Sequence, residues 1–167
     1  MRIGEYCWDM LINGLLLSRW VPFRFRMIML KLIGMNVSTH SAIHSGCFFT
    51  GKRIYLGEGS YINRNCYIDC KDADIRIGNK VGIAPCVQIY TTNHDYSKRE
   101  KRTGNIIPKR VVINDGVWIG GGTIVCPGVN IGKGCVIAAG SIVVKDCLDN
   151  CVYAGNPAKI IKKIKVV

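Results

Sequence analysis

"INDGVWIGGGTIVCPGVNIGKGCVIAAGSIVVKDCL", residues 113–148, divides into units of six residues. The first position of each unit holds a large aliphatic residue, and the fifth holds a smaller one. The first positions are Ile113, Ile119, Val125, Ile131, Ile137 and Val143, and the fifth positions are Val117, Thr123, Val129, Cys135, Ser141 and Cys147. This period is too long for strand alternation, and a helix would return its apolar face every three or four residues. Six-residue units suit a parallel β-helix, in which stacked coils build ladders of aliphatic side chains.

A weaker form of the repeat precedes this stretch. It runs through "VSTHSA" and "IHSGCF" from Val37, "LGEGSY" and "INRNCY" from Leu56, and "IGNKVG" and "IAPCVQ" from Ile77. The period then stops within "QIYTTNHDYSKREKRTG", residues 88–104. We therefore predict a β-helix over residues 36–155 that is interrupted by an extended loop at 90–106.

The open ends of such a coil need covers. Residues 1–35 contain two apolar stretches without the six-residue period, "MLINGLLLSRW" and "FRFRMIMLKLIG", and we predict a short helical segment broken at Pro22. Basic residues interrupt the apolar run, so that neither piece is long enough to span a bilayer. Two alternatives stay open: a peripheral contact with an anionic membrane surface, or packing on the coil end or a neighbouring subunit.

The other end reads "AGNPAKIIKKI", which predicts a turn at Asn156-Pro157 and then a short basic helix or strand, within a basic tail at 156–167. The 167 residues suffice for one main domain, and their net charge is +12. Such a charge favours an anionic partner: a phosphorylated cofactor, a membrane surface or nucleic acid. We predict no nucleic-acid partner, because no RNP-like or helix-turn-helix pattern is present.

The nine cysteines are an odd number, and no convincing signal peptide precedes them. We therefore predict a reducing, cytoplasmic location, with a peripheral position at the inner face of the membrane as a variant of it. Cys66/Cys70 and Cys147/Cys151 are spaced CxxxC without a nearby histidine, so no metal is expected. A thiol at the fifth position of a unit is simply a small hydrophobic side chain.

The repeat, together with "TTNHD", "VWIGGG", "IAAGSIV" and "AGNPAKIIKKI", resembles the hexapeptide-repeat acyltransferases. The most similar branch contains the galactoside, maltose and polysaccharide O-acetyltransferases, and the apolar, basic start resembles acetyltransferases of surface-polysaccharide pathways. The resemblance runs from about Val37 to Ile164. It implies an all-β fold, a left-handed parallel β-helix of triangular section with a short N-terminal helical segment and an extended loop. It also implies a homotrimer with inter-subunit active sites, acetyl-CoA as co-substrate, and a loop histidine as catalytic base.

Transfer of an acetyl group to a hydroxyl requires a base that removes the hydroxyl proton, and histidine suits this task at neutral pH. The chain has three histidines, His40, His44 and His94. His40 and His44 fall on repeat positions where an outward polar residue is expected. His94 stands in the interruption and matches the loop histidine of the family. We predict His94 as general base, with direct transfer and no acyl-enzyme, since no cysteine is paired with a histidine in the pattern.

The resemblance also implies where substrates bind. The amide of Gly121 would face the thioester, with Trp118 and Gly120 beside the same cleft. Asn63 would bind acceptor hydroxyls, and Asp69 is a second acceptor-binding candidate.

The remaining candidates concern coenzyme A. Ala139 would let the pantetheine arm pass close to the coil wall, with Val144 and Lys145 further along the same edge. Lys159 and Lys162 would lie near the phosphates, where a lysine acts as a point charge.

These residues predict an O-acetyltransferase that acts on a hydroxyl of a sugar or of a surface-polysaccharide precursor. The alternatives are an N-acetyltransferase acting on an amino sugar, a xenobiotic acetyltransferase, or a non-enzymatic β-helix binding protein. A β-helix can also host the zinc site of a gamma-type carbonic anhydrase. That site needs three converging histidines, and the spacing of His40 and His44 from His94 resembles no such site.

Overall fold

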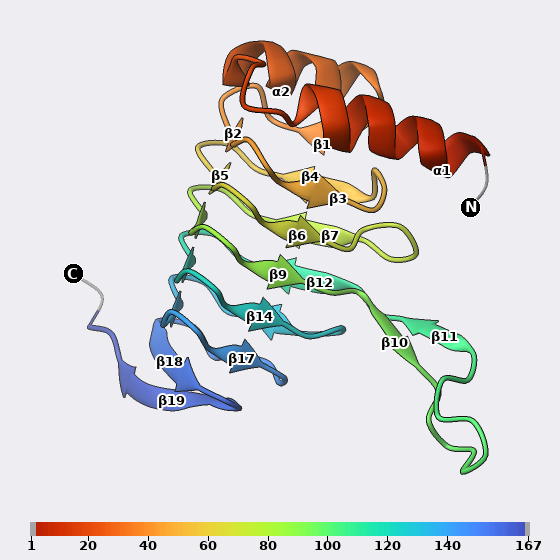
Figure 1. Ribbon diagram of the computed structural model, residues 1–167. Helices are drawn as coiled ribbons and strands as arrows, with labels where there is room; N and C mark the ends of the chain where they lie inside the picture. The colour runs from red at the N-terminus through yellow and green to blue at the C-terminus, as the bar shows by residue number, and fades with distance from the viewer. Residues whose placement is uncertain (1–2, 166–167) are drawn as a thin grey trace.

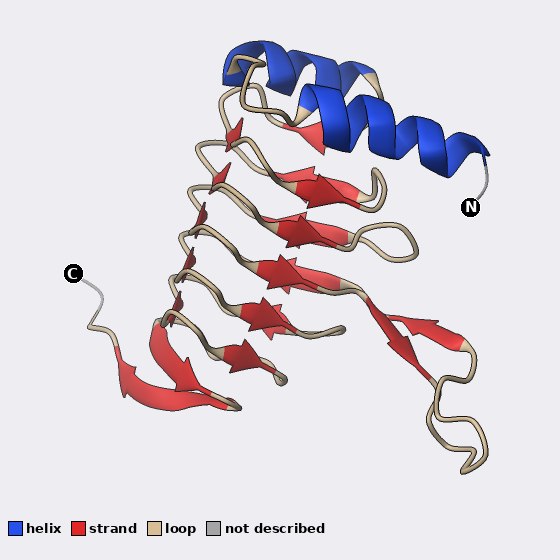
Figure 2. Ribbon diagram, in the orientation of Figure 1, coloured by secondary structure: helices blue, strands red, loops and turns tan. Residues whose placement is uncertain are grey.

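Most six-residue units form a short strand and a tight turn, because the first residue points into the coil and the backbone at the fourth turns the chain onto the next face. The fourth residue has a positive φ, as at Gly122 (67°) and Gly140 (71°), where glycine meets no steric penalty. The computed structural model describes residues 3–165. The chain is a left-handed parallel β-helix with helices across its N-terminal end (Figures 1 and 2), which confirms the predicted fold class. Residues 1–2 of the predicted helical segment and residues 166–167 of the predicted tail lie outside the described chain.

Three sheets form the walls of the coil, and the chain visits them in the order face A, face B, face C. Face A contains β1 (Asn36–Val37), β4 (Ile54–Leu56), β7 (Ile75–Ile77), β12 (Val111–Ile113) and β15 (Asn130–Ile131). Face B contains β2 (Ala42–Ile43), β5 (Tyr61–Ile62), β8 (Gly82–Ile83), β13 (Trp118–Ile119), β16 (Val136–Ile137), β18 (Cys151–Gly155) and β19 (Ala158–Lys163). Face C contains β3 (Phe48–Phe49), β6 (Tyr67–Ile68), β9 (Gln88–Ile89), β14 (Ile124–Val125) and β17 (Ile142–Val143).

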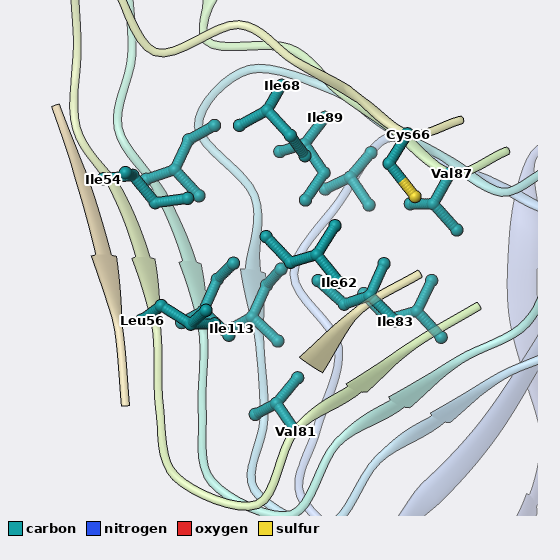
Figure 3. Packing of buried hydrophobic residues seen from close by; sticks show 14 of the residues in the cluster. Ile54, Leu56, Ile62, Cys66, Ile68, Val81, Ile83, Val87, Ile89 and Ile113 are labelled. Atoms are coloured by element: carbon teal, nitrogen blue, oxygen red, sulfur yellow. The ribbon is translucent and has the colours of Figure 1, made fainter. Parts of the chain in front are cut away.

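The core is the space between the three faces. First-position side chains such as Leu56, Ile62 and Ile68 are fully buried there, and fifth-position side chains such as Cys66 and Val87 fill the gaps at the turns (Figure 3). Aliphatic burial of this kind contributes roughly 1.5–3 kcal/mol per large side chain. The stacking therefore stabilises the coil, and the outward positions are left for other tasks.

Coil length varies at one corner. Six residues separate successive first positions from face A to face B and from face B to face C in the coils that the structure describes. From face C back to face A the spacing is seven residues (Phe49 to Leu56), nine (Ile68 to Ile77), twenty-four (Ile89 to Ile113), six (Val125 to Ile131) and four (Val143 to Cys147). We call this position the C–A corner.

The four-residue spacing corrects one prediction. "VVKDCL" was expected to be a regular unit with Cys147 at its fifth position, but Cys147 forms a parallel bridge with Ile131, a first-position residue. The next turn agrees, since Asn150, three residues after Cys147, has the positive φ (52°) of a fourth position. Two residues are thus missing from this corner, and Cys151 takes the fifth position.

The twenty-four-residue spacing at the C–A corner contains a hairpin. Strand β10 (Thr92–His94) pairs antiparallel with β11 (Ile106–Pro108), and the hairpin projects away from the coil (Figure 1). The excursion runs past the loop bounds predicted at 90–106, because β11 extends to Pro108 and the coil resumes at β12.

The ends of the coil are covered differently. Helix α1 (Ile3–Trp8) continues as the π-helical segment η1 (Asp9–Leu16), and α2 (Phe23–Leu32) follows Pro22. Together they lie across the first coil (Figure 1), and no helix within residues 3–165 is long and apolar enough to cross a membrane. At the other end β18 joins face B, and β19 folds back on it as an antiparallel edge strand after the turn at Asn156-Pro157.

Candidate functional site

His94 is the last residue of β10, and its exposed imidazole lies against the opposite arm of the hairpin. Its Nδ1 is 3.0 Å from the carbonyl oxygen of Gly104. A carbonyl can only accept, so this hydrogen bond requires the proton to be on Nδ1. In that tautomer Nε2 carries the lone pair and points away from the contact. The neutral imidazole of His94 can therefore accept a proton at Nε2 in this arrangement.

Gly104 holds this geometry through its own surroundings. Its amide donates to the carbonyl of Asp95 (2.9 Å), and the amide of Asp95 donates to Asn105 (2.8 Å). A Cβ on Gly104 would lie 2.6 Å from the Asp95 carbonyl oxygen, too close for any side chain. The sequence does not single out Gly104, because a glycine in a polar loop is ordinary and only the hairpin register brings it opposite His94.

Asp69 anchors the base of the hairpin. Its carboxylate accepts hydrogen bonds from the amides of Thr91 (3.2 Å) and Thr92 (3.0 Å) and from the hydroxyl of Thr50 (3.0 Å). The Thr91 hydroxyl also donates to the Asp69 carbonyl at 2.6 Å. Asp69 was predicted as an acceptor-binding residue, but its side chain is buried and engaged by the protein itself. Thr50, Thr91 and Thr92 were not singled out, since the sequence does not show which amides return to this carboxylate.

Several other predicted residues lie on the outer surface of face B. Neighbours along a strand point to opposite sides, so the residues that flank an inward first position face outward. Trp118, with 55% of its surface exposed, is aligned with Val136 in the next coil, and Val136 with Val152. Trp118, Val136 and Val152 thus form one column of outward positions. A second column runs beside it through Gly120, and Asn63 lies in this second column, two strands from Gly120. Face B thus brings together residues that are far apart in the sequence.

Small residues form that second column. Gly120 is followed by Ala138 and Ala154, through backbone hydrogen bonds from Gly120 to Ile137 and from Ala138 to Tyr153. Gly120 itself has no room for a side chain, because a Cβ would lie 2.5 Å from the amide nitrogen of Ala139. The column leaves a smooth strip on the wall beside Trp118.

The corner between face B and face C carries Gly121 and Ala139. The amide of Gly122 donates to Pro85, and the Gly121 carbonyl accepts from Gly140, both within the stack. The amide of Gly121 makes no backbone hydrogen bond within residues 3–165. It is available as a donor to a bound group.

Lys159 and Lys162 extend the two columns. Strand β19 pairs Lys162 with Val152 and Lys159 with Ala154, so both lysines face outward with those partners. Lys162 is three strand steps from Trp118, or roughly 14 Å at about 4.8 Å per step. A strip of small and apolar side chains therefore ends in two cations, as an elongated ligand with terminal phosphates requires.

Val144 and Lys145 lie elsewhere. They were expected further along the edge that carries Ala139, but they follow β17 and occupy the C–A corner. This is the corner from which the hairpin leaves, two coils earlier in the chain.

The candidate residues thus form two groups. The first group lies on face B or at its corner with face C and consists of Asn63, Trp118, Gly120, Gly121, Ala139, Lys159 and Lys162. The second group lies at the C–A corner or on its hairpin and consists of Asp69, His94, Val144 and Lys145. Face B is the wall opposite the C–A corner, and the hairpin projects on the side away from β18 (Figure 1). One chain does not bring His94 to face B.

The other two histidines have local surroundings. Nδ1 of His40 lies 3.7 Å from Glu58. Desolvation, with Arg64 and Arg26 nearby, lowers the pKa of His44, so its imidazole is neutral at pH 7. No group of three or more metal-ligating side chains occurs among the described residues.

Comparison with known proteins gives a consistent picture. The bacterial transferase hexapeptide family (six repeats) matches residues 110–145. A galactoside O-acetyltransferase of Lactococcus lactis is 42% identical over 132 residues, which cover 74% of this chain and 63% of that protein. The chain spans about three fifths of the length of the curated relatives that it matches.

Two solved structures extend the comparison. A maltose O-acetyltransferase from Clostridium difficile has 35% identity and a TM-score of 0.83, covering 97% of this chain and 86% of that one. A hexapeptide-repeat-containing acetyltransferase from Vibrio cholerae, in complex with acetyl coenzyme A, has 32% identity and a TM-score of 0.72, covering 85% and 78%. The sequence resemblance is thereby confirmed.

Proposed function

This chain belongs to the hexapeptide-repeat acyltransferase family, in the branch of the galactoside and maltose O-acetyltransferases, and from that premise we propose that it transfers an acetyl group from acetyl-CoA to a hydroxyl of a sugar or surface-polysaccharide precursor. The observation that carries the proposal is the contact between His94 Nδ1 and the Gly104 carbonyl. It leaves Nε2 as the proton acceptor on an exposed arm.

His94 takes the acceptor's hydroxyl proton on Nε2 while the hydroxyl oxygen forms a bond to the thioester carbon. Gly121 donates its free amide to the oxygen on which negative charge develops. When the carbon–sulfur bond breaks, His94 returns the proton to the departing sulfur. The acetyl group passes directly to the acceptor, and a positioned base of this kind contributes roughly 10²- to 10⁴-fold.

The outer surface of face B fits coenzyme A. The small column formed by Gly120, Ala138 and Ala154 admits the pantetheine arm, Trp118 borders it, and Lys159 and Lys162 attract the phosphates. At the hairpin corner, Val144 and Lys145 would contact the same molecule from a neighbouring copy. Asn63, on face B, binds the acceptor hydroxyls.

A homotrimer completes the site. His94 and face B lie on opposite sides of one chain, so a shared site needs the hairpin of one subunit beside face B of the next. The trimer is supported by this separation. The peripheral membrane contact predicted for the N-terminal segment is a separate proposal, because it depends on the helices and not on the hairpin.

The test measures release of free CoA thiol with panels of sugars, nucleotide sugars, amino sugars and antibiotics. His94→Ala should lower turnover on the best acceptor by roughly 10²- to 10⁴-fold and leave acetyl-CoA binding, measured by calorimetry, unchanged. The matched control is His40→Ala, since the His40 imidazole is also exposed and lies on the coil, with its Nδ1 3.7 Å from Glu58. Retained turnover in His94→Ala would refute the assigned base.

The product separates the remaining alternatives. An O-acetyl ester is cleaved by mild hydroxylamine, whereas an N-acetyl amide is not. A product resistant to hydroxylamine would indicate an amino sugar as acceptor. A chain that binds no acetyl-CoA would instead be a non-enzymatic binding protein.

A further inference from the structure

Helix α2 differs from an ordinary surface helix in burying an arginine and exposing large apolar side chains. Its inward face carries Arg26, only 2% exposed, together with Met27 and Leu30. The guanidinium donates to the carbonyls of Leu16 (2.9 Å) and Ile43 (2.7 Å) and to those of Ser18 (2.6 Å) and Val21 (2.8 Å). Because these bonds tie α2 to the end of η1 and to the first coil, they fix which face of α2 points outward.

The outward face of α2 is apolar and basic. Phe25 (54% exposed), Ile28 (51%) and Leu32 (74%) recur three and four residues apart, so they lie on one side of the helix. Arg24 and Lys31 are exposed on the same side, next to Ile28 in the helical rotation. An apolar row, bordered along one edge by two cations, thus faces away from the coil.

The adjoining segments also expose apolar side chains. Met10 (53%), Leu11 (50%) and Leu15 (63%) are exposed on η1, and Trp20, with 87% of its surface exposed, lies in the turn before α2. We call the whole set the cap surface: Met10, Leu11, Leu15, Arg19, Trp20, Arg24, Phe25, Ile28, Lys31 and Leu32. Exposed apolar side chains in such density usually mark an interaction site.

Charge selects the occupant of this surface. No aspartate or glutamate occurs between Asp9 and Glu58, so the exposed cations Arg19, Arg24 and Lys31 have no acidic neighbour along that stretch of chain. A second copy of the cap surface would bring like charges together. An anionic lipid surface matches both the basic and the apolar side chains of the cap surface. The basic side chains attract the lipid headgroups, while the aromatic and aliphatic side chains enter the acyl boundary.

We propose that the cap surface docks on an anionic lipid bilayer. The helices lie across the end of the coil (Figure 1), so docking places the coil upright on the membrane with face B and the hairpin accessible along its sides. The contact is peripheral. It does not depend on acetyl transfer, so either proposal can fail alone.

The experiment is flotation of the full chain with vesicles of phosphatidylcholine alone or mixed with phosphatidylglycerol. We expect binding to the mixed vesicles that weakens as salt is raised. The triple variant Arg19→Gln/Arg24→Gln/Lys31→Gln should lower the partition coefficient by roughly a hundredfold, since each basic residue near the surface contributes about fivefold. Phe25→Ser/Ile28→Ser/Leu32→Ser should also abolish binding, with circular dichroism to show that both variants are folded.

The matched control is Leu148→Ser/Ile161→Ser, because these residues are as exposed (64% and 63%) but lie far from the cap. The control should bind like the unaltered protein. Absence of binding to phosphatidylglycerol vesicles, or an equal loss in the control, would overturn the proposal. So would light scattering that shows cap-to-cap association abolished by the serine triple, because the occupant would then be a second copy.

Discussion

The carboxylate of Asp69 accepts a 3.0 Å hydrogen bond from the backbone amide of Thr92, which is two residues before His94 in the chain. This hydrogen bond and the one from Thr91 fasten the hairpin to the end of β6. Asp69 is therefore a positioning residue in the proposed reaction.

Asp69→Ala should leave two amides without an acceptor, at a local cost of about 1–3 kcal/mol each. We expect kcat to fall roughly 10- to 100-fold with little change in KM for acetyl-CoA, because misplacing a catalytic group costs rate before binding. Hydrogen exchange at Thr91 and Thr92 should become faster. The control is Asp72→Ala, an exposed carboxylate in the same turn, and unchanged exchange in Asp69→Ala would contradict the anchoring role.

Gly104→Ala tests the orientation of the imidazole. The new Cβ would lie 2.6 Å from the Asp95 carbonyl oxygen. The hairpin arm whose Gly104 carbonyl accepts the hydrogen bond from His94 Nδ1 must therefore shift. Turnover should fall roughly tenfold or more, with the melting temperature nearly unchanged, because the hairpin lies outside the core. Gly4→Ala has open space around its Cβ and serves as control; full activity in Gly104→Ala would refute the orienting contact.

Mixed oligomers test the division of the site between subunits. His94→Ala and the double variant Lys159→Glu/Lys162→Glu should each be nearly inactive alone. Co-refolded together they should regain a fraction of the activity, because some interfaces then pair an intact hairpin with an intact face B. A site contained in one chain would give no recovery, and an unaltered protein refolded alone controls for yield.

Arg26→Met tests the cap. Removing the guanidinium leaves four carbonyls without their donor, and we expect a loss of about 2–4 kcal/mol in the free energy of unfolding, measured with urea. Arg24→Ala, on the outward face of the same helix, should change it by less than about 0.5 kcal/mol. Equal effects of the two substitutions would mean that burial of Arg26 contributes nothing.

Cys70 gives a pH dependence. Burial raises the pKa of its thiol to about 12, above the ordinary value of about 8.5. The unfolded chain therefore loses this proton first, so the stabilising contribution is present below about pH 8.5 and is lost as pH rises toward 12. Cys70→Ala should flatten the decline of stability between pH 9 and 11 in denaturant titrations. An unchanged alkaline decline would assign it to other groups.

The repeat predicted most of the fold, because the first and fifth positions decide which side chains fill the core. It did not predict the short turn before Cys147, since the sequence keeps a small residue at the expected fifth position there and only strand pairing shows the shift. The burial of Arg26 could not be predicted from the sequence for another reason. A basic residue in an apolar run is expected to be exposed, and the four carbonyls that accept its hydrogen bonds come from η1, from the turn before α2 and from β2.

In the candidate site, too, some residues could be predicted from the sequence and others could not. His94 could be singled out because it interrupts a regular pattern, and Trp118 and Gly120 because they belong to a motif. The partners of His94 and Asp69 depend on hairpin register and on coil stacking, which no single segment encodes. Val144 and Lys145 were assigned to the wrong edge, because the repeat alone does not show at which corner each turn falls.

The confinement of unequal spacings to the C–A corner bears on how such a protein can diversify. At the corners between faces A and B and between faces B and C, first positions are always six residues apart in the described coils. An insertion there would shift every later aliphatic residue out of its ladder. At the third corner the chain has accepted spacings from four to twenty-four residues while the ladders stayed aligned. Evolution can therefore lengthen, shorten or replace the segment between Ile89 and Val111, which includes the hairpin that carries His94, without changing the residues of the three faces. The same boundary marks where a foreign loop can be grafted.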